Sequence, residues 1–125
     1  MPAKRTQQPK WLPDVQESNY LAATSYLALL FPNKGVEKII DKLRAARVGK
    51  FKAKDIFRAS QLSLLGVSNS HVENERRKIK DGAALSPILL VHDERNGRVI
   101  VADGYHRLCA VYSFDEDALI PCKIA

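Results

Sequence analysis

The clearest pattern of apolar and polar positions lies in residues 34–46, where apolar side chains recur at helical spacing with lysines between them. These apolar residues are Val36, Ile39, Ile40 and Leu43. The Ala- and Leu-rich segment 17–30 predicts another helix, which we expect to stop at Pro32 because proline disfavours helix in the residue before it. Residues 1–16, with their prolines, glutamines and basic residues, predict a flexible basic arm ahead of a helical extension over 17–47.

The middle of the chain gives weaker signals. Val48 and Phe51 predict a short strand, while residues 55–67 match neither period, so a short helix and a strand before a turn at Gly66 both stay open. Ser68-Asn69-Ser70 supplies capping side chains for a helix that runs to about Lys80. We expect Ser70 and Glu73 to form a capping box there and Gly82 to provide a left-handed exit.

The last third predicts a compact strand and helix unit. We expect a strand over 88–91, a hairpin turn at 96–97 and a return strand over 99–101. A helix from about residue 105 and a closing strand over 119–124 follow. Asn96-Gly97 favours a type I′ turn, which needs positive φ at both positions. Pro121 lacks an amide donor, which favours an edge position for the closing strand. The fold class we predict is α+β, a small mixed sheet with packed helices.

Composition limits the class of protein. With 125 residues, 46% hydrophobic and 27% charged, the chain has the size and balance of one soluble domain. No run approaches the ~18 apolar residues of a membrane span, and no apolar segment follows the basic start as in a secretory signal. Two cysteines, Cys109 and Cys122, do not make a disulfide framework or a zinc site. We expect a cytoplasmic protein without a membrane partner.

Positive charge is concentrated in the first part of the chain. Residues 1–80 hold 16 Lys and Arg against 7 Asp and Glu, whereas residues 81–125 hold 4 against 7. Nine basic residues lie between positions 34 and 58, namely Lys34, Lys38, Lys42, Arg44, Arg47, Lys50, Lys52, Lys54 and Arg58. They could attract nucleic acid without sequence preference. A solvated helix face followed by a lysine-guarded edge strand explains them better, because the aromatics of a single-strand binding surface are not interleaved here.

The segment 103–107, Asp-Gly-Tyr-His-Arg, carries the candidate chemistry, because it joins a strand to a helix start. Gly104 lets the backbone approach an anion, and the first amides of a helix favour phosphate. Arg107 offers a planar fork of donors, and His106 could bind phosphate or move a proton. Asp103 could hold a metal ion or accept a proton, and Tyr105 could stack on a base.

Structural roles compete with each of these functional roles. Asp103 is also suited to capping the helix, and His106 to packing. Arg107 could instead pair with Glu116 or Asp117.

Three further groups lie outside this turn. Lys52 and Lys54 could reach the phosphate from the first strand, although a solvated strand edge explains them better. His71 and His92 lack metal-ligand spacing to another ligand. Trp11 and Tyr20 are expected to anchor the N-terminal segment to the core.

The order of motifs resembles the ParB/sulfiredoxin superfamily, which implies a domain over residues 48–125 that matches best over roughly residues 70–125. The matching segments are Pro87 to Val91, Val99 to Ala110 with its Asp-Gly-x-x-Arg-x-x-Ala pattern, and Ile120 to Ile124. The resemblance implies a small domain that binds a nucleotide phosphate at residues 104–107. Tyr105 stands where sulfiredoxins carry their catalytic cysteine and Cys109 suits a core position, so we expect no sulfinic-acid reductase activity. We also expect no centromere-type DNA-binding domain of the ParB kind.

The closest local similarity is to the free-serine kinases of that superfamily, whose turn reads Asp-Gly-x-His-Arg. It implies that Asp103 activates a hydroxyl or holds Mg²⁺, while His106 and Arg107 bind phosphate. The predicted function is therefore binding of ATP, ADP or CTP, with phosphotransfer or hydrolysis by Asp103 and His106 left open. The alternatives are a non-catalytic nucleotide-controlled adaptor, which could be a homodimer, and a nucleic-acid-binding protein that uses residues 34–58.

Overall fold

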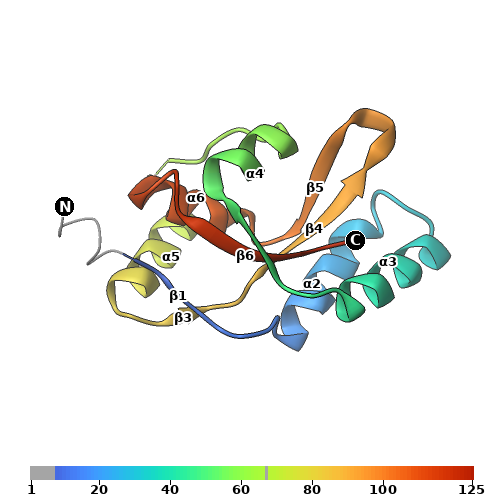
Figure 1. Ribbon diagram of the computed structural model, residues 1–125, viewed down its shortest axis with the longest axis horizontal. Coiled ribbons are helices and arrows are strands. Elements are labelled where there is room, and N and C mark those ends of the chain that lie inside the picture. Colours follow the sequence, from blue (N-terminus) through green and yellow to red (C-terminus); the bar gives the residue numbers. More distant parts are fainter. Residues whose placement is uncertain (1–7, 67) are drawn as a thin grey trace.

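The computed structural model describes residues 8–66 and 68–125, which form an α+β fold (Figure 1). Its helices are α2 (Glu17–Leu27), α3 (Asn33–Ala45), α4 (Ala53–Ser60), α5 (Ser70–Lys80), the 3₁₀ turn η1 (Glu94–Asn96) and α6 (Tyr105–Phe114). Its strands are β1 (Lys10–Trp11), β2 (Gly49–Lys52), β3 (Ala84–Leu85), β4 (Ile88–Asp93), β5 (Arg98–Asp103) and β6 (Leu119–Ile124). The predicted fold class is confirmed, and residues 55–60, left open between helix and strand, belong to α4.

Four of the strands form one mixed sheet in the order β2-β6-β4-β5. β6 runs parallel to β4, while the β2–β6 and β4–β5 pairs are antiparallel. β1 and β3 form a separate parallel pair. Asp103, the last residue of β5, therefore lies on an edge strand at the opposite side of the sheet from β2.

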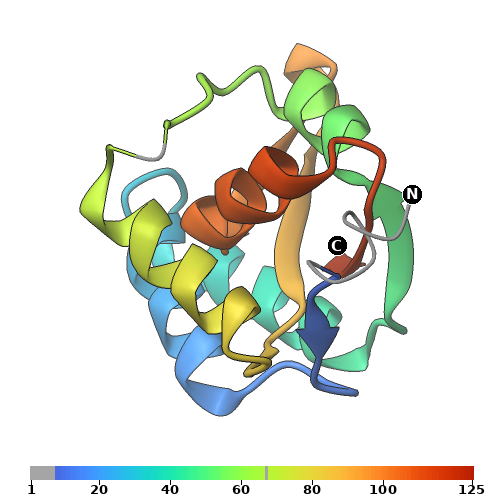
Figure 2. The ribbon, with the colours of Figure 1, turned by 90° about the vertical axis from the view of Figure 1, so that its left-hand side faces the viewer.

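Both faces of this sheet are buried, because its strands alternate between two core clusters. The first cluster lies under α4, α5 and α6 and takes Ile88, Leu90 and Val101 from the sheet. The second lies under α2 and α3 and takes Leu89, Val91, Ile100 and Ala102. The N-terminal helices thus cover a sheet face of their own chain, and Figure 2 shows α5 and α6 side by side in front of the other face.

The position of β6 corrects the edge assignment for Pro121. β6 lies between β2 and β4, with Pro121 opposite Lys50 of β2. Pairing with β4 begins only at Cys122, one residue after the proline. The missing amide of Pro121 therefore falls before the start of that ladder, which is how a central strand accommodates it.

The predicted flexible arm is also corrected where it is described. Residues 1–7 lie outside the described residues. Lys10 and Trp11 pair with Ala84 and Leu85, and the Leu12 amide donates to the Leu85 carbonyl over 2.7 Å. Trp11 packs against the first core cluster and Tyr20 is buried in the second, so both aromatics anchor this region as expected.

Two local predictions about turns and caps are wrong. The β4–β5 hairpin closes through η1 with a left-handed Gly97, and among described non-glycine residues only Gln61 has positive φ, so the turn is not type I′. Asn69 caps α5 by accepting from the amides of His71 and Val72, so Ser70 and Glu73 form no capping box. Gly82 is left-handed at φ +78°, as predicted.

In the described ranges, no helix has both the length and the apolar character needed to cross a membrane.

Candidate functional site

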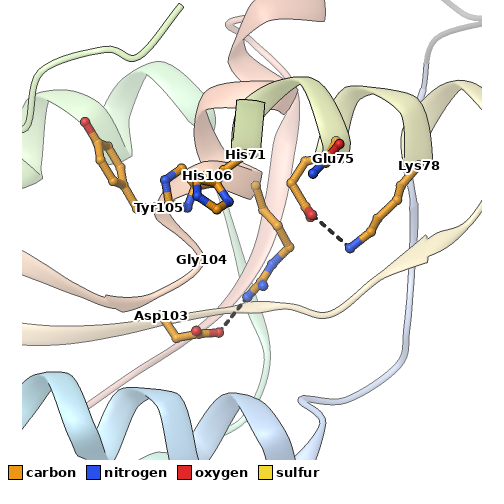
Figure 3. A pocket seen from close by; sticks show the side chains of 9 residues that line it. His71, Glu75, Lys78, Asp103, Gly104, Tyr105 and His106 are labelled. Carbon is orange, nitrogen blue, oxygen red and sulfur yellow. Dashed lines mark hydrogen bonds and ion pairs between the residues drawn. The ribbon is translucent and has the colours of Figure 1, made fainter. Parts of the chain in front are cut away.

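A cavity of about 460 Å³ opens between one face of α5 and the start of α6 (Figure 3). Its lining comes from two places in the chain: His71, Asn74, Glu75 and Lys78 on α5, and Asp103, Gly104, Tyr105, His106 and Arg107 at the β5–α6 turn. All five residues predicted from the Asp-Gly-Tyr-His-Arg segment therefore line one cavity. Its volume lies in the range typical of small-molecule sites.

The start of α6 supplies unpaired backbone donors to this cavity. Gly104 is the N-cap, and no side chain among the described residues caps the helix. Asp103 therefore does not serve as the cap, which was one of its alternatives. The first amides of a helix have no partner within it, and the helix dipole favours negative charge there. A β-bulge between Leu89 and Leu90 lies opposite this end of β5, a feature that reorients side chains next to functional sites.

Arg107 is held in place by Asp103. Its Nη2 donates to Asp103 Oδ2 over 2.8 Å and to the Pro87 carbonyl over 3.4 Å. The two side chains are only 13% and 15% exposed, so water screens the pair weakly. Arg107 Nε is buried and has no hydrogen-bond partner among the described atoms. The alternative pairing of Arg107 with Glu116 or Asp117 is thus wrong, because the guanidinium faces back towards β5.

Gly104 is required by this arrangement. Its φ is +109°, and a Cβ there would lie 2.9 Å from Arg107 Nη2 and 2.9 Å from Ile88 Cγ1. Only a residue without a side chain leaves room for the guanidinium to cross the turn.

His106 meets His71 of α5 across the cavity. The two rings lie 4.9 Å apart between centroids with their planes at 38°. Burial lowers the pKa of His106, and the neighbouring His71 lowers it further, against an opposing effect of Glu75. His106 is therefore neutral at pH 7 and carries one donor and one acceptor nitrogen. The ring of His106 packs against His71, which agrees with the structural role considered for it, and His106 also lines the cavity.

Tyr105 lies on the other side of His106 and points away from His71 (Figure 3). The ring centroids of Tyr105 and His106 are 5.6 Å apart, and the Tyr105 hydroxyl donates to the Ser63 carbonyl. Burial raises the pKa of Tyr105. The ring is thus tied to the loop before α5 at the border of the cavity.

The α5 wall was missed by the sequence prediction. His71, Asn74, Glu75 and Lys78 follow the spacing i, i+3, i+4 and i+7, which places them on one helix face. Glu75 accepts from Lys78 over 2.8 Å on that face. A polar stripe of this kind, flanking the buried Val72 and Ile79, is the signal that could have found the wall.

Lys52 and Lys54 do not reach this cavity. They lie at the end of β2 and the start of α4, where their Nζ atoms are 3.8 Å and 2.7 Å from Asp117 Oδ1. β6 and β4 separate β2 from β5, so the strand order keeps both lysines away from the β5–α6 turn. Their predicted role as phosphate ligands finds no support in this placement.

The donor set does not fit a metal ion held by the protein. No group of three His, Cys, Asp or Glu side chains suited to a metal occurs in the described part of the chain. Asp103, the predicted Mg²⁺ ligand, has one carboxylate oxygen engaged by Arg107.

The basic residues between positions 34 and 58 lie along α3, β2 and α4. Several are already paired: Arg44 with Glu17 over 2.7 Å, Arg58 with Asp55 over 3.8 Å, and Lys52 and Lys54 with Asp117. Such pairing is typical of a solvated surface, and nucleic-acid binding by this region stays a prediction.

Comparisons with protein-family models, curated proteins and solved structures gave no match. The resemblance to the ParB/sulfiredoxin superfamily therefore stays a prediction.

Proposed function

We propose that the α5–α6 cavity binds the phosphate groups of a nucleotide. One observation carries the proposal: the uncapped start of α6 and the guanidinium of Arg107 line the same cavity. Backbone amides at a helix start and an oriented arginine are complementary to phosphate oxygens. Across residues 8–66 and 68–125, no side-chain cap occupies the amides, and the contacts of Arg107 with Asp103 and Pro87 engage only Nη2 of its guanidinium.

The Asp103–Arg107 pair prepares this binding. Because Asp103 fixes one Nη of Arg107, the guanidinium loses little conformational freedom when an anion arrives. His106 adds a ring nitrogen at the second position of α6, next to the same amides. The phosphate in this proposal rests on the amides of residues 105–107, between His106 and Arg107.

The remainder of the ligand is assigned to the borders of the cavity. Tyr105 offers an aromatic face on which a base can stack. Lys78, with 56% of its side chain exposed, is free to move from Glu75 to a second phosphate. A nucleoside di- or triphosphate uses both ends of such a cavity, whereas free phosphate uses only one.

Calorimetric titration with ATP, ADP and CTP, with and without Mg²⁺, tests the proposal. We expect binding that weakens at least tenfold in Arg107→Gln and in His106→Asn. Arg95→Gln, at an exposed arginine of η1, is the matched control and should bind like the wild type. Far-UV circular dichroism of each variant separates lost binding from lost folding.

Absence of binding by every nucleotide would overturn the proposal and make α6 an ordinary helix start. Unchanged affinity in both folded site variants would also overturn it, because the ligand would then lie elsewhere.

Turnover of the nucleotide is a second candidate function, favoured by the lowered pKa of His106. A neutral imidazole can accept a proton from water or from an acceptor hydroxyl. Phosphate release or transfer that is lost in His106→Asn even at nucleotide concentrations that saturate the variant would support it. Binding without turnover supports the non-catalytic adaptor.

A further inference from the structure

The two histidines of the cavity occupy equivalent places on two helices. His71 is the second residue of α5 and His106 the second residue of α6. A cationic ring near a helix N-terminus is disfavoured by the helix dipole. The adjacent rings, 4.9 Å apart, also repel each other when both are protonated. This geometry disfavours a state in which both rings carry charge while the cavity holds no anion.

The other charges that face these rings cancel within the lining. On α5 Glu75 is paired with Lys78, and at the β5–α6 turn Asp103 is paired with Arg107. Tyr105 is the remaining titratable neighbour, and it is neutral with a raised pKa. With neutral histidines the lining carries no net charge, although it is built to receive an anion.

A doubly charged oxyanion at the start of α6 reverses this balance. It places negative charge beside His106 and also near His71, because the two rings are adjacent in the cavity. A nearby opposite charge favours the protonated form of an imidazole. Protonation also converts the acceptor nitrogen of the ring into a second donor, which a fully deprotonated oxyanion can use.

We infer that the His71–His106 pair takes up a proton from solvent when the cavity binds a dianionic phosphate or sulfate group. The inference rests on the proposed phosphate site and adds its regulation. No bond is made or broken except the transfer of one proton from the buffer to a ring nitrogen. Affinity for the anion then rises as the pH falls, which makes the site more occupied in acidified surroundings.

Sulfate is the probe of choice, because it stays doubly charged from pH 5.5 to 8 while nucleotide phosphates titrate within that range. Calorimetry in two buffers with different heats of ionisation measures the protons taken up for each sulfate bound. We expect close to one proton at pH 7. The dissociation constant should then rise about tenfold for each pH unit above the pKa of the empty site, as linkage requires.

The chain provides its own control, because it contains three histidines. His71→Asn and His106→Asn should each reduce the proton uptake and flatten the pH dependence. His92→Asn, at an exposed position on β4 outside this cavity, should leave both unchanged. His71 is itself exposed, so its replacement is compatible with folding.

The outcomes separate this inference from the proposed function. Sulfate and nucleotide binding without proton uptake would overturn the inference and leave the phosphate site standing. Proton uptake that persists in both His71→Asn and His106→Asn would overturn it as well. If neither sulfate nor any nucleotide binds at any pH, the proposed function fails and the inference fails with it.

Discussion

Arg107 and Asp103 form an ion pair that closes directly over Gly104. The Nη2 and Oδ2 atoms are 2.8 Å apart, and the same Nη2 lies 2.9 Å from the place where a Cβ of residue 104 would stand. The end of β5, Gly104 and the start of α6 therefore form one unit. In it, Asp103 at the end of β5 orients Arg107 in the first turn of α6. This coupling makes the turn rigid before any ligand arrives.

Gly104→Ala is expected to lower the free energy of unfolding by about 2–4 kcal/mol, from backbone strain at φ +109° and from the contacts with Arg107 and Ile88. Urea denaturation measures the change. Gly97→Ala is the matched control: its φ is +62°, and nothing lies within 4 Å of the added Cβ, so about 1 kcal/mol of strain is expected. Equal losses in the two variants would show that the close approach to Arg107 has no energetic weight.

A double-mutant cycle should show coupling between Asp103 and Arg107. Asp103→Asn and Arg107→Gln are each expected to cost about 1–3 kcal/mol of stability, because each leaves a partly buried charge without its partner. The double variant should lose less than the sum of the two, with a coupling of about 1–2 kcal/mol. Urea unfolding of the four proteins gives the coupling free energy. Additive losses would mean that Asp103 and Arg107 stabilise the fold through their other contacts and not through each other.

The sequence predicts the β5–α6 turn well because all of its parts are local. Gly104 marks the left-handed position, and the apolar spacing after Tyr105 marks the helix, so Asp103 to Arg107 are found together without knowledge of the rest of the chain. The α5 wall is different. The contact between His71 and His106 joins residues 35 positions apart, and no spacing pattern along the chain indicates that the two rings meet.

Strand order explains the errors about Lys54 and Pro121. Local pattern places β2 and β6 correctly along the chain, but it does not show that β6 enters the sheet between β2 and β4. That single topological fact separates β2 from the β5–α6 turn and makes Pro121 part of a central strand. Lys54, which was expected on the first strand, lies just past β2 at the start of α4, where it pairs with Asp117.

Lys123 is expected to be essential for joining the N-terminal helices to the sheet. It is 3% exposed, and its Nζ donates to the Tyr20 hydroxyl over 2.9 Å and to the Arg44 carbonyl over 3.2 Å. Lys123→Met should cost about 2–4 kcal/mol, because both acceptors then lack a buried donor. Lys50→Met, at an exposed position on β2, should change stability by less than about 0.5 kcal/mol.

The same lysine gives stability a dependence on alkaline pH. Burial opposes its charge, but hydrogen bonds to Tyr20 and Asp14 outweigh burial and hold the pKa of Lys123 above its ordinary value. A pKa raised by folding contributes stability that is complete below the unfolded pKa and is lost as the pH rises through the folded one. Urea midpoints between pH 9 and 11.5 should therefore fall more steeply in the wild type than in Lys123→Met. Parallel curves would assign the alkaline loss to other groups.

Both cysteine thiols are expected to be inert in the folded protein. Cys109 and Cys122 are 0% and 1% exposed, and burial raises the pKa of each thiol, that of Cys122 to about 12. The reactive thiolate is thus both scarce and inaccessible at pH 8. An aromatic disulfide reagent should label no thiol in buffer and two thiols in 6 M urea. Rapid labelling of Cys109 in the folded state would contradict its core position one turn into α6. It would also make Cys109 a candidate for the sulfinic-acid reductase activity that we do not expect, because Tyr105 stands where sulfiredoxins carry their catalytic cysteine.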